Sequence, residues 1–225
     1  CSPNFIGRGS KSMSKFIVYP AVSSKQLGFY IDSARCSGCK ACQVACKDKN
    51  NLDVGRKFRR VYEITGGGYS RNTNGALINN VFAYTLSISC NHCDDPICVK
   101  NCPTTAMHKR EGDGIVMVDT DKCVGCGACA WSCPYGAPQM DPETKQMSKC
   151  DFCIDLQQKG EQPVCVATCP LGAIQFGPID ELRERYGEVN YVTGLPSPEI
   201  THPNLVINPH QGANNDTINN KGEIK

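Results

Sequence analysis

Sixteen of the 17 cysteines in this 225-residue chain fall into four groups of four, spaced in a way that could bind metal. The groups are Cys36, Cys39, Cys42 and Cys46; Cys90, Cys93, Cys98 and Cys102; Cys123, Cys126, Cys129 and Cys133; and Cys150, Cys153, Cys165 and Cys169. Groups one and three have the spacing C-x2-C-x2-C-x3-C, and the middle gap widens to four residues in group two and eleven in group four. The chain therefore contains an internal repeat of one ligand loop with insertions.

This spacing favours iron-sulfur clusters over the other uses of cysteine. A [4Fe-4S] cluster needs four thiolates, and three cysteines spaced by two residues can wrap one cluster, while the fourth binds the other cluster of a two-cluster module. Zinc fits less well, because structural zinc sites usually combine two separated CxxC or HxxxH pairs. Disulfides fit least, because the sequence shows no secretory signal. We therefore predict four [4Fe-4S] clusters.

The order of the groups along the sequence predicts which cysteines share a cluster. Groups two and three, joined by a short segment, have the arrangement of a bacterial two-cluster ferredoxin. Groups one and four pair by exclusion around this inner module. The predicted ligand sets are Cys36, Cys39, Cys42 and Cys169 for site 1; Cys150, Cys153, Cys165 and Cys46 for site 2; Cys90, Cys93, Cys98 and Cys133 for site 3; and Cys123, Cys126, Cys129 and Cys102 for site 4.

Short strands and turns must position these loops. The residues before group one, 31–35, resemble residues 118–122 before group three, which predicts a strand leading into each loop. Residues 106–108 and 115–118 flank a Glu-Gly-Asp-Gly turn and predict a β-hairpin. We expect strands at residues 28–32 and 173–176 to lie side by side.

Two further segments complete the predicted architecture. A Gly-Gly-Gly turn at residues 66–68 separates residues 60–64 from the apolar run at 81–88, and residues 179–186 predict a short helix. From about residue 194 onward the sequence is rich in Pro, Asn and Gly, and we expect an extended segment that lies on a neighbour or is disordered.

The predicted fold class is α+β, with two interleaved bacterial ferredoxin-like 2[4Fe-4S] modules, short β-hairpins and helices, an insertion and an extended C-terminal tail. The predicted parts are an N-terminal extension at 1–26, an outer module at 27–50 and 146–180, an insertion at 51–86, an inner module at 87–145 and a C-terminal helix and tail at 181–225.

The formal net charge of +2 and the even spread of charges exclude nucleic-acid binding as the main function. Four clusters of about −2 each would bring the protein to about −6. Six basic residues lie within two positions of a ligand, and either tune reduction potentials or are solvated surface charges: Arg35, Lys40, Lys47, Lys100, Lys122 and Lys149. The pair Arg59-Arg60 is predicted to lie on the surface rather than to be an export signal.

No catalytic residue is predicted, because the sequence shows no nucleotide-binding glycine motif and no nucleophile elbow. His92 and His108 are expected to form hydrogen bonds rather than to bind metal, since each group already has four thiolates. Trp131, between two ligands, is expected to pack near a cluster. No segment is apolar and long enough for a transmembrane helix.

Five stretches resemble one known family more closely than the cysteines alone do, namely residues 28–39, 87–93, 106–111, 133–139 and 176–183. They lie between about residues 27 and 210 and resemble the iron-sulfur subunit of the complex molybdoenzymes, most closely the dimethyl sulfoxide reductase branch. The resemblance implies a molybdopterin catalytic subunit that reduces dimethyl sulfoxide or a related S- or N-oxide. It also implies a menaquinol-oxidising membrane anchor or a cytochrome as electron donor, with this protein as a non-catalytic relay.

The resemblance also bears on cluster type and location. Nitrate-reductase relatives have Trp in place of the second cysteine of group three and hold a [3Fe-4S] cluster, whereas this sequence retains Cys126. The implied location is the periplasmic side of the bacterial cytoplasmic membrane through partner subunits, or the outer membrane or cell exterior if Cys1 is lipidated. The alternatives are a free-standing polyferredoxin and the iron-sulfur subunit of a polysulfide, tetrathionate or formate molybdoenzyme.

Overall fold

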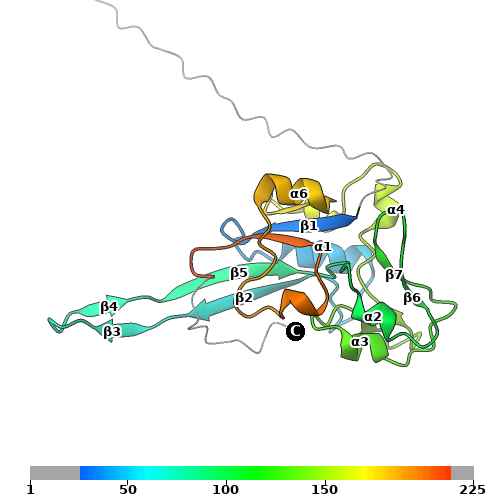
Figure 1. The fold of residues 1–225 in the computed structure, drawn as a ribbon, viewed down its shortest axis with the longest axis horizontal. Helices are drawn as coiled ribbons and strands as arrows, with labels where there is room; N and C mark the ends of the chain where they lie inside the picture. Colours follow the sequence, from blue (N-terminus) through cyan, green and yellow to red (C-terminus); the bar gives the residue numbers. More distant parts are fainter. Residues whose placement is uncertain (1–25, 214–225) are drawn as a thin grey trace, which may run out of the picture.

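A three-stranded sheet forms one side of the protein in the computed structural model, which describes residues 26–213 (Figure 1). Its central strand β1 (Leu27–Asp32) is buried at all six positions. Strand β10 (Ile174–Pro178) pairs with β1 antiparallel, and β11 (Leu205–Asn208) pairs with it parallel. The predicted contact between residues 28–32 and 173–176 is therefore confirmed, with Phe29 opposite Phe176.

Helix α6 (Ile179–Tyr186) covers this sheet and has the predicted bounds. Acidic residues in its first turn and arginines in its last turn complement the helix dipole. On its inner face Ile179 and Leu182 are buried against Tyr30 and Val206. The Tyr30 ring stacks on the Tyr186 ring with centroids 3.8 Å apart.

The segment after α6 differs from the prediction. Residues 205–208 form β11 inside the fold, preceded by a 3₁₀ turn at Pro198–Ile200, instead of an extended segment lying on a neighbour. Leu205, Val206 and Ile207 are buried, because the sheet places them between α6 and the main hydrophobic core. The part of the predicted tail at 214–225 and the N-terminal residues 1–25 lie outside the described residues.

The insertion forms a long two-stranded arm that projects from the body (Figure 1). Strand β2 (Arg60–Gly66) pairs with β5 (Phe82–Ile88), and β3 (Tyr69–Arg71) pairs with β4 (Leu77–Asn79) further out. The turn predicted at 66–68 is wrong, since the backbone only kinks there and reverses at residues 72–76. Gly67 has φ +78°, and a Cβ atom there would lie 2.0 Å from the Asn80 carbonyl oxygen.

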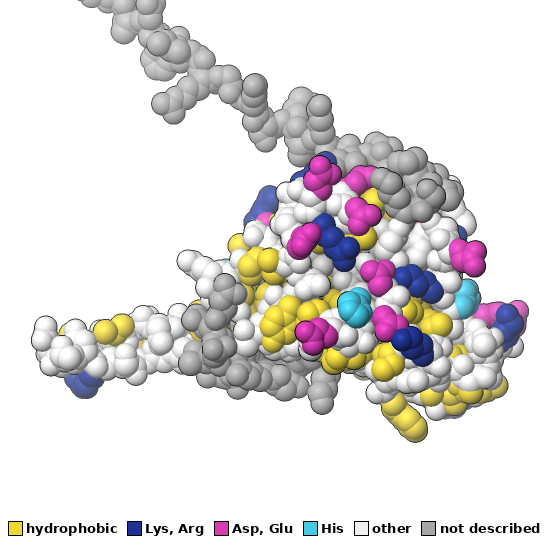
Figure 2. Space-filling view, in the orientation of Figure 1, with side chains coloured by type: hydrophobic (Ala, Val, Ile, Leu, Met, Phe, Trp, Pro, Cys, Tyr) yellow, Lys and Arg dark blue, Asp and Glu magenta, His cyan; other side chains and the backbone are white. Residues whose placement is uncertain are grey.

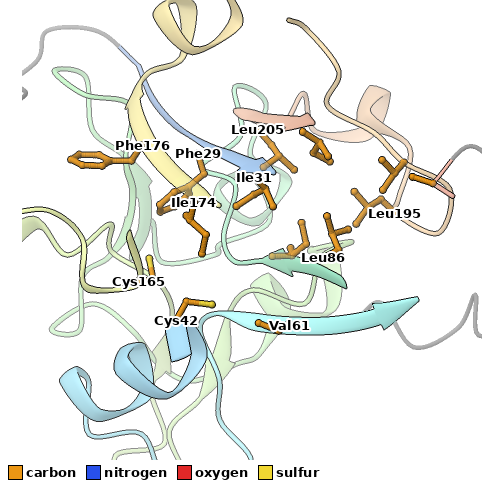
Figure 3. Packing of buried hydrophobic residues seen from close by; sticks show 14 of the residues in the cluster. Phe29, Ile31, Cys42, Val61, Leu86, Cys165, Ile174, Phe176, Leu195 and Leu205 are labelled. Atoms are coloured by element: carbon orange, nitrogen blue, oxygen red, sulfur yellow. The ribbon is translucent and has the colours of Figure 1, made fainter. Parts of the chain in front are cut away.

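The main hydrophobic core lies between the three-stranded sheet and the base of the arm. Figure 3 shows Ile31 and Leu205 from the sheet above Leu86 and Val61 from the arm. Two cysteines, Cys42 and Cys165, extend into the same core. Packing of the core is therefore continuous with the cysteine loops.

Short elements carry the cysteine loops on the other side of the protein. The predicted hairpin is confirmed as β6 (Met107–Lys109) paired with β7 (Val116–Val118). The remaining elements are α1 (Ala41–Lys49), α2 (Ile97–Lys100), α3 (Ala128–Ser132), β8 (Gln139–Met140), β9 (Met147–Ser148), α4 (Ile154–Gln157) and α5 (Val164–Ala167). Among the described residues, no helix has the length and apolar character needed to span a membrane.

Candidate metal centres

Site 1 lies where the loop after β1 meets the loop before β10. Its cavity is lined by the thiols of Cys36, Cys39, Cys42 and Cys169. Asp32 starts the first loop, because its carboxylate accepts hydrogen bonds from the backbone N–H groups of Ala34 and Arg35 at 3.1 and 3.0 Å. The Ala173 N–H donates to Sγ of Cys169 at 3.3 Å, a contact that stabilises negative charge on sulfur. The four predicted cysteines of site 1 are therefore neighbours.

Site 4 lies at the opposite end, beside the β6–β7 hairpin. Its cavity is lined by Cys102, Cys123, Cys126 and Cys129. The backbone N–H groups of Met107 and Met147 donate to the sulfurs of Cys102 and Cys123, both at 3.3 Å. Burial alone would raise the pKa of Cys102, but the Met107 N–H and the Thr104 hydroxyl lower this pKa below its ordinary value. The loop is thus prepared to hold a thiolate.

Site 3 lies in the interior next to site 4. Burial, together with the neighbouring thiols of Cys90, Cys133 and Cys93, raises the pKa of Cys98 to about 12. Burial likewise raises the pKa of Cys93 to about 12, with Cys90 and Cys133 again as neighbours. The four cysteines predicted for site 3 thus act on one another electrostatically.

Site 2 is the most buried of the four. Burial raises the pKa of Cys150 well above its ordinary value, and Cys46 and Cys165 add to this effect. Burial also raises the pKa of Cys46 to about 11 and of Cys153 to about 12, and Cys165 is a close neighbour of both. The cysteines predicted for site 2 therefore also come together, although they are contributed by α1, α5 and the loop before α4.

The chemistry and spacing of these thiols fit a polynuclear group. All sixteen cysteines in the described part of the sequence are free thiols. The cysteines of sites 1 and 4 surround cavities, and within residues 26–213 no three His, Cys, Asp or Glu side chains are placed to hold a single ion. A [4Fe-4S] cluster suits this wider arrangement, because its four thiolates bind four different irons.

The four sites form a row in numerical order. Cys42 of site 1 and Cys165 of site 2 lie side by side at the edge of the core (Figure 3). Cys150 of site 2 neighbours Cys90 of site 3. Cys98 of site 3 and Cys129 of site 4 belong to one hydrophobic cluster.

The two ends of the row reach the surface. Cys39 of site 1 and Cys126 of site 4 are exposed, whereas the cysteines of sites 2 and 3 are buried or partly buried. The row therefore has one exposed ligand at each end.

The basic residues near the ligands are of two kinds, exposed ones and ones that are partly or fully buried. Arg35, Lys40, Lys100 and Lys122 are exposed, and the last two pair with Asp95 and Asp119, which fits solvated surface charges. Lys47 is partly buried and donates to the carbonyl oxygens of Asp53 and Arg56. Lys149 is buried and donates to the carbonyl oxygens of Val116 and Cys150.

Arg59 is the residue that sequence reasoning missed. The predicted surface location is wrong for it, because its side chain is only 1% exposed. Arg60 is half-buried and donates to the carbonyl oxygen of Tyr135 at 2.6 Å. Two adjacent arginines carry no sequence signal for burial, which arises here from the packing of the arm against the ligand loops.

Among the remaining single-residue predictions, those for the two histidines are confirmed and the one for Trp131 is wrong. His92 accepts a hydrogen bond from the Val116 N–H at 3.0 Å, and a ring nitrogen of His108 lies 3.1 Å from the Ala106 carbonyl oxygen, so both form hydrogen bonds as expected. The expected packing of Trp131 is wrong, because this side chain is 88% exposed. Val124, two residues before Cys126, is also exposed. Figure 2 shows hydrophobic side chains on the surface at the end of the molecule that carries α2 and α3.

Two protein families match the sequence. A 4Fe-4S dicluster domain matches residues 81–179, and a 4Fe-4S binding domain matches residues 33–54. The first match contains groups two, three and four, and the second contains group one. The cofactors of the protein are thus [4Fe-4S] clusters, and sixteen grouped cysteines provide for four of them.

Known proteins that are similar to this one over most of its length identify its family more specifically. The protein is 54% identical to the B subunit of the anaerobic dimethyl sulfoxide reductase of Escherichia coli (strain K12), over 82% of its own length and 89% of the relative. It is 50% identical to the corresponding B subunit of Haemophilus influenzae, over 84% and 92%. It is also 41% identical to the thiosulfate reductase electron transfer subunit PhsB of Salmonella typhi, over 67% and 74%. The protein therefore belongs to the family of anaerobic dimethyl sulfoxide reductase B subunits, which are iron-sulfur electron-transfer subunits.

Proposed function

We propose that this protein relays electrons through four [4Fe-4S] clusters to a molybdopterin subunit that reduces dimethyl sulfoxide or a related S- or N-oxide. The electron donor in this proposal is a quinol-oxidising membrane anchor or a cytochrome. The observation that carries it is the row of four thiol-lined sites with an exposed cysteine at each end. Each cluster, when bound, supplies one-electron redox chemistry.

The ligand sets of this proposal are the four cysteines that surround each site. Site 1 and site 2 exchange their fourth ligands, Cys169 and Cys46, and form the outer module of residues 27–50 and 146–180. Site 3 and site 4 exchange Cys133 and Cys102 and form the inner module of residues 87–145. The exchange fixes two clusters close together in each module, which suits stepwise electron transfer.

The protein's own residues prepare sites 1 and 4 for a negatively charged group. Backbone N–H groups point at Cys102, Cys123 and Cys169, each at 3.3 Å. Hydrogen bonds to the sulfur ligands of a cluster stabilise its reduced state and so raise its reduction potential. Burial of sites 2 and 3 excludes water from the middle of the row.

The two exposed ends suit two different partners. At the site 1 end, the arm rises from the rim of the cavity, since Cys36, Glu63 and Thr85 line one hollow there. The outer arm carries exposed Tyr69 and Leu77. At the site 4 end, Val124 and Trp131 are exposed beside Cys126. A free polyferredoxin would not need apolar side chains at both ends, so these surfaces favour a fixed complex.

With these partners, the proposed location is the periplasmic side of a bacterial cytoplasmic membrane. If Cys1, which lies outside the described residues, is lipidated, the proposed location is the outer membrane or the cell exterior. A second candidate substrate class is another oxidised sulfur compound, because a thiosulfate reductase electron transfer subunit is 41% identical to this protein.

The test is metal analysis of the complex purified anaerobically through a tag on this subunit. The proposal expects about sixteen irons and sixteen acid-labile sulfides per chain, with molybdenum in the same fractions. Sixteen irons without molybdenum or a second subunit would favour a free polyferredoxin. Turnover of dimethyl sulfoxide against thiosulfate by the purified complex then separates the two substrate classes.

A further inference from the structure

Arg59 is a fully buried cation whose guanidinium donates hydrogen bonds to uncharged oxygens. Its Nη1 donates to the carbonyl and hydroxyl oxygens of Ser87 at 3.4 and 3.2 Å, and its Nη2 donates to the Ser89 hydroxyl at 2.9 Å. The guanidinium carbon lies 4.5 Å from the centre of the Phe29 ring. Its Nε has no hydrogen-bond partner among the described residues.

Such a cation is stable in a protein interior only when negative charge lies nearby. Burial lowers the pKa of the Arg59 guanidinium, and negative charge on Cys165, Cys42, Cys150 and Cys46 raises it above its ordinary value. Cys42 is a ligand of site 1, and the other three are ligands of site 2. The Arg59 backbone N–H is also hydrogen-bonded to Cys46. Ser87 links the arginine to site 1 directly, because its hydroxyl oxygen lies 3.5 Å from Sγ of Cys42.

We propose that Arg59 is a buried counter-ion shared by sites 1 and 2, where it raises the reduction potentials of the two clusters. The inference rests on the ligand sets of the proposed function. Adding one electron to either site adds one negative charge close to the guanidinium, which stays protonated at any working pH. The attraction is strong because the interior screens charge weakly. Arg59 thus acts as a positioning residue that keeps one positive charge beside sites 1 and 2.

The substitution that tests this role is Arg59→Met in the intact complex, with Arg59→Lys as its charge-preserving counterpart. The readout is a redox titration of the complex followed by electron paramagnetic resonance, with iron measured in parallel. Arg59→Met is expected to shift two of the four potentials downward and leave the other two unchanged. Arg59→Lys is expected to keep all four near the original values.

A matched control is Arg71→Met, since Arg71 is an exposed arginine on the outer arm that donates to the Gly75 carbonyl. It should leave all four potentials unchanged. If Arg59→Met loses the iron of two sites while Arg59→Lys retains all of it, the need for positive charge is supported. The inference would be overturned if Arg59→Met left all four potentials unchanged or shifted all four equally. It would also be overturned if both Arg59 variants lost the same amount of iron. Absence of clusters from the unmodified protein would instead reject the proposed function.

Discussion

The side-chain amide of Asn204 donates a hydrogen bond to the backbone carbonyl oxygen of His92, with 2.9 Å between the two atoms. The same amide donates to the Asp94 carboxylate at 3.0 Å, and the Asn204 N–H donates to the Asn91 carbonyl oxygen. Residues 91–95 form the loop that carries Cys93 of site 3. The C-terminal segment therefore holds a ligand loop in place, 112 residues away in the sequence.

We expect Asn204→Ala to destabilise this loop by about 1–3 kcal/mol, because it removes a hydrogen bond to the buried His92 carbonyl oxygen and a second one to the partly exposed Asp94 carboxylate. The cluster of site 3 should be lost first on warming. The measurement is visible absorbance against temperature, with electron paramagnetic resonance on samples taken partway through the transition. Asn74→Ala, at the exposed tip of the arm, is the control and should leave the transition unchanged. A transition in Asn204→Ala at the unmodified temperature would contradict this role.

The parts of the fold that could be predicted are those with a local signal. Cysteine spacing defines four groups, and their order in the sequence predicts sets whose members lie near one another in the structure; their role as cluster ligands stays a prediction. The β1–β10 contact follows from pairing groups one and four by exclusion, and helix α6 has the bounds predicted from the sequence. These features depend on residues that are close in sequence or repeated.

The parts that could not be predicted depend on long-range packing. Strand β11 is only four residues long and lies in a segment rich in Pro and Asn, so its apolar pattern is too short to be distinctive. Burial of Arg59 requires the arm and two ligand loops to meet around it. The three glycines at 66–68 predict a turn, whereas the chain continues outward through Gly67, which has φ +78°, and reverses at residues 72–76.

Gly125→Ala is expected to disrupt site 4 alone. Gly125 lies between two ligands of this site with φ +67°, and a Cβ atom there would lie 1.9 Å from the Lys145 carbonyl oxygen. Neither the backbone conformation nor the contact tolerates a methyl group. Iron should fall by about four atoms of sixteen per chain, with loss of one set of resonance signals.

The matched control is Gly112→Ala in the β6–β7 turn, where a Cβ atom would meet nothing within 4 Å. It should retain all of the iron. Full iron content in Gly125→Ala would show that the loop of site 4 can rearrange, against the packing described above.

Cys126→Trp should convert site 4 to a [3Fe-4S] cluster. Cys126 is exposed, so a large side chain can point outward without displacing the core. One iron would then lack a thiolate, and iron should fall by about one atom per chain while a signal of the oxidised three-iron cluster appears. Cys1→Ser, outside the four groups, is the control and should change neither quantity. An unchanged iron content in Cys126→Trp would remove Cys126 from the ligand set.

Substitution of the apolar side chains on the outer arm should separate the protein from a partner without affecting the clusters. Tyr69 and Leu77 are 71% and 65% exposed, and Ile78 is also exposed. A two-stranded ribbon is only marginally stable by itself, so an arm of this length with apolar side chains is expected to be covered in the complex. The triple variant Tyr69→Ser, Leu77→Ser, Ile78→Ser should retain its iron, but several-fold less molybdenum should co-purify with it. The control is Val189→Ser, at an exposed apolar position beyond α6, and the purified complex should contain the normal amounts of iron and molybdenum. If the triple variant recovers molybdenum in the normal ratio to iron, the partner does not depend on the arm.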